Sequence, residues 1–94
     1  MGNEQIDPGA ERLLPGEERA MENDSLGDAK HFVQVYEELY GFKRKLISEL
    51  DQKMAEAMPA SRDELRQDDR IFNREADRLR RRLEYWRGEA ASRQ

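Results

Sequence analysis

The chain has 94 residues, enough for one small domain, and its 17 Lys and Arg against 21 Asp and Glu give a net charge of −4. It contains no cysteine, which excludes a disulfide framework and a thiolate metal site. Neither an apolar run of about 18 residues nor a signal-peptide pattern is found in the sequence. We therefore expect a cytoplasmic protein that has no membrane partner.

Residues 1–27 have the composition of an acidic tail. The segment holds seven acidic residues, two arginines and two Pro-Gly pairs. Its only Leu, Ile, Val or Phe residues are Ile6, Leu13, Leu14 and Leu26. Because so little apolar surface cannot offset the conformational entropy that is lost on ordering, we predict that this segment is disordered or weakly ordered.

The first predicted helix covers about residues 28–58. Asp24, Ser25 or Asp28 can cap its start, and Pro59 is expected to end it. Its apolar positions alternate in steps of four and three, which is the heptad spacing of a coiled coil. The row consists of Phe32, Tyr36, Leu39, Lys43, Leu46, Leu50, Lys53 and Ala57.

The second predicted helix covers about residues 61–88, after a turn at 58–61. Ser61 and Glu64 have the spacing of a capping box, in which each side chain accepts from the backbone N–H of the other residue. A second heptad row follows, with the same alternation of steps. It consists of Leu65, Asp69, Phe72, Ala76, Leu79, Leu83, Trp86 and Ala90.

A short turn between two heptad rows predicts an all-α fold, an antiparallel two-helix hairpin of coiled-coil type over residues 28–90. Facing residues then have numbers that sum to about 119. This register places Lys43 beside the small side chain of Ala76, where its ammonium group can reach Glu75 or Asp77. Polar groups in such a seam fix the register at some cost in stability.

The first helix is apolar on both flanks of its seam, whereas the flanks of the second helix are charged. The apolar face of the second helix is therefore too narrow to cover that of the first helix. An exposed apolar face is typical of a contact surface. We expect a further helix to pack there, from a larger protein or from a second copy in a dimeric four-helix bundle. The predicted protein interface consists of Val33, Tyr40, Phe42, Ile47, Met54 and the amphipathic aromatic Tyr85.

A cluster of arginines in the second helix supports an alternative, the binding of nucleic acid or of another anionic ligand. Its members are Arg78, Arg80, Arg81 and Arg82. Acidic residues lie three positions away in pairs such as Glu75–Arg78, and they neutralise part of this charge. Nucleic acid is therefore the less favoured partner.

The sequence offers little for catalysis. His31 is the only histidine, and it has no second imidazole or thiol with which to form a metal or nucleophile site. The adjacent acids Glu37 and Glu38 point about 100° apart on a helix, so they do not form an acid–base pair. We predict no catalytic, cofactor-binding or metal-binding residues. The expected function is a small non-enzymatic protein–protein interaction module, acting as an adaptor, a regulator or an assembly subunit.

Overall fold

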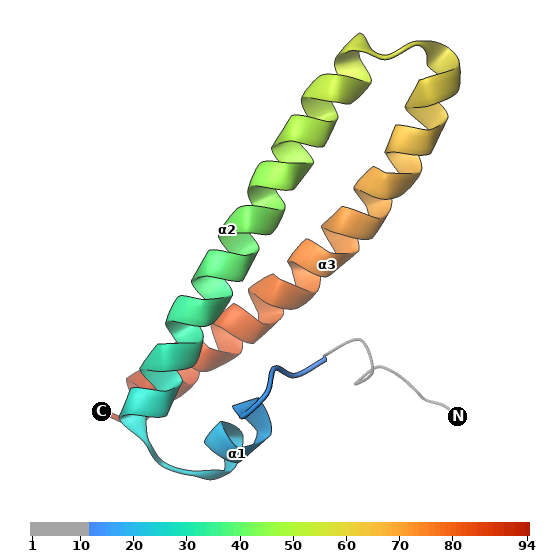
Figure 1. Cartoon of the computed structure of the whole chain (residues 1–94). Coiled ribbons are helices and arrows are strands. Elements are labelled where there is room, and N and C mark those ends of the chain that lie inside the picture. Colours follow the sequence, from blue (N-terminus) through green and yellow to red (C-terminus); the bar gives the residue numbers. More distant parts are fainter. Residues whose placement is uncertain (1–11) are drawn as a thin grey trace, which may run out of the picture.

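The computed structural model describes residues 12–94, which form three helices and no strand. α1 spans Glu17–Glu22, α2 spans Leu26–Glu56 and α3 spans Pro59–Ser92. The two long helices run antiparallel and are joined by a tight turn, while α1 lies at the opposite end of the pair (Figure 1). We call this opposite end the open end. The predicted all-helical hairpin is confirmed, and the short helix α1 is an addition to it.

α2 begins at Leu26, two residues before the predicted start. Ser25 caps it, because the side-chain Oγ of Ser25 accepts a hydrogen bond of 3.0 Å from the backbone N–H of Asp28. Ser25 is thus the N-cap among the three residues that were predicted as candidates. Its side chain satisfies one of the free N–H groups of the first turn. The helix ends at Glu56, and Ala57 is already extended.

α3 begins at Pro59, so proline opens the second helix, and the capping box does not form. Met58 is the N-cap residue without a side-chain hydrogen bond, and Ser61 lies inside the helix. Proline suits the first helical position, because its fixed φ is helical and its missing N–H has no partner there in any case. The guanidinium of Arg62 donates to the carbonyl of Ala57 at 2.9 Å, which ties the turn to α3.

The two heptad rows meet in the predicted register. Phe32 stacks on Trp86 with ring centroids 5.2 Å apart. Lys43 Nζ lies 2.7 Å from Glu75 Oε1 and 5.0 Å from the centre of the Phe72 ring, so Glu75 is its partner among the two expected acids. The buried apolar residues of the two long helices are Ala29, Phe32, Tyr36, Ile47, Leu50, Ala76, Leu79, Leu83 and Trp86.

Residues 12–25 fold back over the open end of the hairpin. This arrangement differs from the disordered or weakly ordered tail that composition predicts for residues 1–27. We call this segment the strap. Gly16 turns the chain into α1 with φ of 84°, a left-handed conformation that glycine adopts without strain. Glu17 and Ala20 of α1 are buried. The tail prediction rested on the few apolar residues of this segment and left out polar contacts, and its residues 1–11 lie outside the described residues.

Candidate functional site

The carboxylate of Glu17 is fully buried at the open end and accepts hydrogen bonds from both long helices. The hydroxyl of Tyr36 in α2 donates to Oε1 at 2.5 Å, and the indole N–H of Trp86 in α3 donates to Oε2 at 2.8 Å. Arg82 of α3 donates to the same Oε2 through Nε, at 2.8 Å, and through Nη2. The backbone N–H of Leu14 adds a bond of 2.8 Å to Oε1. We call Tyr36, Arg82 and Trp86 the carboxylate pocket.

The pKa values define the charges in this pocket. Burial by itself raises the pKa of Glu17, but the hydrogen bonds from Tyr36, Leu14, Trp86 and Arg82 together outweigh it, and the pKa is lowered. Burial and the hydrogen bond to Glu17 raise the pKa of Tyr36, which therefore stays neutral. At neutral pH the pocket thus holds one carboxylate, one guanidinium and one neutral phenol.

Tyr85, a predicted interface residue, supports the arginine of the pocket. The guanidinium of Arg82 lies over the Tyr85 ring, 4.7 Å from its centre. Such a stacked contact is favourable for a planar cation. Both residues belong to α3, so the orientation of Arg82 is partly set within its own helix.

A second arginine, Arg93, joins the end of α3 to the strap. It donates to the carbonyl of Ser25 and to that of Ala20, each at 2.9 Å, and to the side-chain oxygen of Asn23 at 3.3 Å. Glu89 pairs with the same guanidinium at 2.9 Å. These contacts lie beyond residue 88, the predicted end of the second helix, and α3 continues to Ser92.

Three large apolar side chains remain exposed along the middle of the hairpin. Phe42 and Leu46 of α2 are 62% and 44% exposed, and Ile71 of α3 is 42% exposed. We call these three residues the apolar strip.

The strip lies on the strap side of the hairpin. In α3, Ile71 is followed at steps of four, three and four by Glu75, Arg78 and Arg82, and the last two contact the strap. These steps keep residues on one face of a helix. In α2, Tyr40 lies on the side of the hairpin opposite to the strap, where it lines a shallow pocket together with Arg87 of α3. Phe42 and Leu46 lie on the other flank of α2, which is the strap side.

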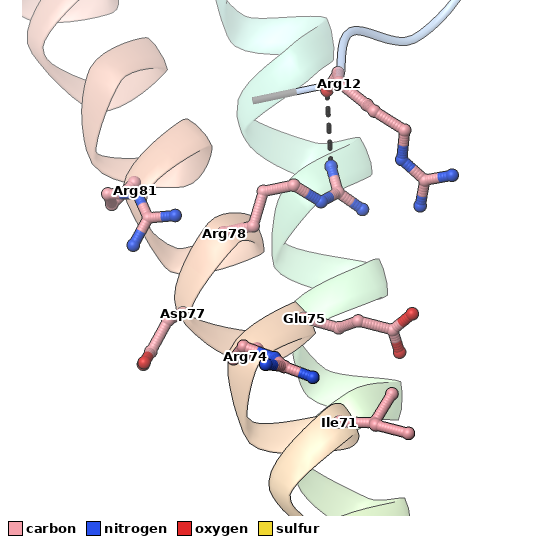
Figure 2. A pocket seen from close by; sticks show the side chains of 7 residues that line it. All are labelled: Arg12, Ile71, Arg74, Glu75, Asp77, Arg78 and Arg81. Carbon is pink, nitrogen blue, oxygen red and sulfur yellow. Dashed lines mark hydrogen bonds between the residues drawn. The ribbon is translucent and has the colours of Figure 1, made fainter. Parts of the chain in front are cut away.

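A shallow pocket of about 330 Å³ borders the strip on α3. Arg78 Nη1 donates to the backbone carbonyl of Arg12 at 3.2 Å, so the first described residue of the strap lies at this pocket (Figure 2). Glu75 and Ile71 point to one side of α3 in Figure 2 and Asp77 to the other. Four arginines against two acids make the lining basic; it consists of Arg12, Ile71, Arg74, Glu75, Asp77, Arg78 and Arg81.

The predicted interface residues do not share one surface. Ile47 is 4% exposed and belongs to the seam between α2 and α3. Val33 and Tyr40 are half-buried on the flank away from the strap, and Met54 is half-buried near the turn. Phe42 alone of the six is widely exposed. The apolar residues of α2 therefore lie on three surfaces: the seam with α3, the strap side and the opposite flank.

The four arginines of the predicted anion contact are also separated. Arg82 is buried against Glu17. Arg80 pairs with Glu84 at 3.2 Å on the flank away from the strap. Arg78 and Arg81 line the pocket beside the strip. An external anion therefore meets two of the four, together with Arg74.

Glu17 and Arg93 were not among the predicted site residues. One signal for Glu17 is its spacing, since Leu14, Glu17 and Ala20 follow one another at steps of three, as on one face of a short helix.

Comparisons with protein-family models, with curated proteins and with solved structures found no match to this chain. Among the described residues, no helix combines the length and apolar character that crossing a bilayer requires.

Proposed function

We propose that this protein is a small, cytoplasmic, non-enzymatic protein–protein interaction module that docks an acidic amphipathic helix of a partner protein on its apolar strip. The observation that carries the proposal is the exposure of Phe42, Leu46 and Ile71 on one side of the hairpin. Exposed apolar residues contributed by two neighbouring helices are typical of a groove that receives a third helix.

The strap supplies an internal precedent for this binding mode. It covers the open-end half of the strap side, where Ala20 is buried and Leu14 and Met21 pack against the core. The turn half of the same side, which carries the strip, has no such cover among the described residues. A partner helix lying along the strip would continue the path of the strap and give a three-helix cross-section.

Charge favours an acidic partner. The pocket beside the strip is lined by four arginines and two acids, and one of these acids, Glu75, is already paired with Lys43. The strap, which packs on the same side of α3, is itself acidic in α1. Complementary charge of this kind sets the choice of partner and the association rate more than the affinity.

The test uses a synthetic amphipathic helical peptide with Glu on its polar face, and the same peptide with Lys in place of Glu. Fluorescence anisotropy with the full chain should show binding of the Glu peptide only. Phe42→Ser and Leu46→Ser should each abolish this binding. Met58→Ser is the matched control, because Met58 is 75% exposed at the turn and lies outside the strip. Equal binding of the two peptides, or no effect of Phe42→Ser, would refute the proposal.

Two other occupants of the strip give different results. If a second copy covers it in a four-helix bundle, light scattering of the wild-type chain will give the mass of a dimer, and Phe42→Ser will give that of a monomer. If residues 1–11 cover it, the Glu peptide will bind only after those residues are removed. Either result would replace the proposed partner.

Nucleic-acid binding is the weaker proposal, because Arg78, Arg80, Arg81 and Arg82 have different surroundings. It predicts that duplex DNA or single-stranded RNA binds the full chain at low salt, with an affinity that falls as salt rises. Arg74→Ala with Arg78→Ala should then reduce binding, whereas Arg80→Ala should not. Absence of binding at low salt would exclude it.

A further inference from the structure

We infer that the hairpin carries a receptor for a peptide carboxylate, formed by Tyr36, Arg82 and Trp86, and that the chain's own Glu17 is its internal occupant. An acidic segment of a partner chain would be the external ligand and would displace the strap. This site lies at the open end, away from the apolar strip, and the inference does not depend on the proposed function.

The first argument is that the side-chain donors lie on the hairpin, whereas the carboxylate acceptor lies on the strap. All three side chains that bind the Glu17 carboxylate belong to α2 or α3. The strap supplies the carboxylate, one backbone N–H and the Met21 sulfur, which accepts from Arg82 at 3.6 Å. Tyr36 and Trp86 are fully buried and Arg82 is 8% exposed. Tyr85 holds the guanidinium of Arg82 from within α3. The binding geometry is therefore built on the hairpin.

The second argument is the small apolar contribution of the strap. Ala20 is its only fully buried apolar residue; Leu14 and Met21 are partly buried against the core, and Leu13 is 40% exposed. A buried ion pair adds little net stability, because the desolvation of both charges offsets most of their attraction. Another carboxylate can replace the contacts that Glu17 makes in the carboxylate pocket, and a backbone carbonyl of the ligand can replace that of Ala20 at Arg93.

The third argument is the link between the strap and α2. Asn23 is extended, with φ of −104° and ψ of 178°, and Ser25 is extended as well. The first turn of α2 is capped locally by Ser25 and Asp28. The side chain of Asn23 also bonds to Asp28 and to the backbone N–H of Ser25, each at 2.9 Å. Displacement of α1 therefore has to break the bond from Arg93 to the carbonyl of Ala20, while these local bonds keep the first turn of α2 capped.

The strap also indicates which ligand fits. Glu17 enters the pocket with Leu14 three residues before it and the small Ala20 three residues after it, and Arg93 binds the carbonyl of Ala20. The external ligand is accordingly a peptide in which Glu has an apolar residue three positions before it and a small residue three positions after it.

The experiment uses Trp86, the only tryptophan of the chain, as the reporter. The full-length Glu17→Ala variant is titrated with a peptide of residues 12–25, and with the same peptide carrying Gln at position 17. We expect red-shifted Trp86 emission in the variant and its reversal by the Glu peptide alone. Binding to the wild-type chain should be weaker by about tenfold or more, because the strap occupies the pocket most of the time. Glu18→Ala, at the exposed neighbouring position, should behave as wild type.

Several results would overturn the inference. They are a folded Glu17→Ala chain that does not bind the Glu peptide, equal binding of the Gln peptide, and equal affinity for variant and wild-type chains. A wild-type dimer that exchanges straps would make a second copy the ligand and would also overturn it. Phe42→Ser should leave this titration unchanged, which separates its outcome from that of the strip.

Hydrogen exchange of the wild-type chain provides a test if Glu17→Ala fails to fold. The backbone N–H of Ala20 is bonded to the carbonyl of Gly16, and that of Glu17 to the carbonyl of Leu14. A displaceable strap predicts that both amides exchange by local opening, much faster than the amides around Leu79 in the core. Equal protection of strap and core would refute displacement.

Discussion

Glu17 of the strap and Arg82 of α3 form a buried ion pair, with Arg82 Nε 2.8 Å from Glu17 Oε2. The two residues are 65 positions apart in the sequence. The pair joins α1 to α3, and its consequences for stability can be measured directly.

Arg82→Met should destabilise the protein strongly. It leaves the Glu17 carboxylate buried without a counter-charge, and breaking a buried pair in this way costs about 3–5 kcal/mol of unfolding free energy. Urea denaturation followed by circular dichroism measures this loss. Release of the strap into water would lower the cost, and Trp86 fluorescence would then report the release.

Two controls belong to this measurement. Arg80→Met removes an exposed pair with Glu84 and should cost less than about 1 kcal/mol. The double variant Glu17→Leu with Arg82→Met removes both charges and should recover much of the stability. If it is no more stable than Arg82→Met alone, the ion pair is not the cause of the loss.

The strap should resist acid down to an unusually low pH. The pKa of Glu17 is lowered below the ordinary value of 4.5 in the folded chain. Its contribution to stability is therefore present above the unfolded-state pKa and is lost as the pH falls through the lowered folded-state pKa. Trp86 emission should stay constant from neutral pH to about 4.5 and change only below it. A transition above that value, absent from Glu17→Gln, would contradict the prediction.

Asp69→Asn should stabilise the hairpin at neutral pH. Burial, and next the interaction with the carboxyl group of Asp51, raise the pKa of Asp69. A raised folded-state pKa means that stability is greatest below the unfolded-state value and is lost as the pH rises through the folded-state value. At pH 7 the ionised carboxyl group is therefore unfavourable, and removing its charge should gain about 0.5 kcal/mol.

Thermal unfolding at two pH values checks the Asp69 prediction. The gain from Asp69→Asn should be present at pH 7 and should disappear below 3.8, the ordinary value for Asp. Asp68→Asn, at the exposed adjacent position, provides the control. A gain of equal size for both variants would point to net charge as its source.

Ile47 and Phe42 should behave oppositely although both were predicted as interface residues. Ile47 is buried in the seam, so Ile47→Ala should cost about 2–5 kcal/mol of unfolding free energy. Phe42 is 62% exposed, and Phe42→Ala should change stability by less than about 0.5 kcal/mol. Urea denaturation distinguishes the two. A large loss for Phe42→Ala would mean that Phe42 is covered, in solution, by another part of the chain or by a second copy.

The hairpin was predictable because its apolar residues repeat at regular heptad spacing along both helices. The heptad rows and the turn give the antiparallel pairing, and the register gives the contact of Lys43 with Glu75. Helix ends were less accurate, since proline can either follow a helix or open one, and Pro59 opens α3.

The strap was not predictable from composition. Its order depends on one buried carboxylate, Glu17, and on donors at Tyr36, Arg82 and Trp86 that come near it only once the hairpin has formed. The burial of Ile47, a predicted interface residue, was not predictable for a related reason. Its position between seam and flank depends on how far α3 turns toward it, and periodicity does not determine this rotation.

The covalent link between strap and pocket has a quantitative consequence for any competitor. Because only a short segment separates Glu17 from α2, its carboxylate is present at the pocket at an effective concentration on the order of millimolar. A partner that offers a single carboxylate would rarely exceed this concentration in free solution. A helix that contacts the apolar strip and then reaches the open end gains from two linked contacts. Such a bivalent partner would therefore compete with the strap for the carboxylate pocket better than an isolated acidic peptide.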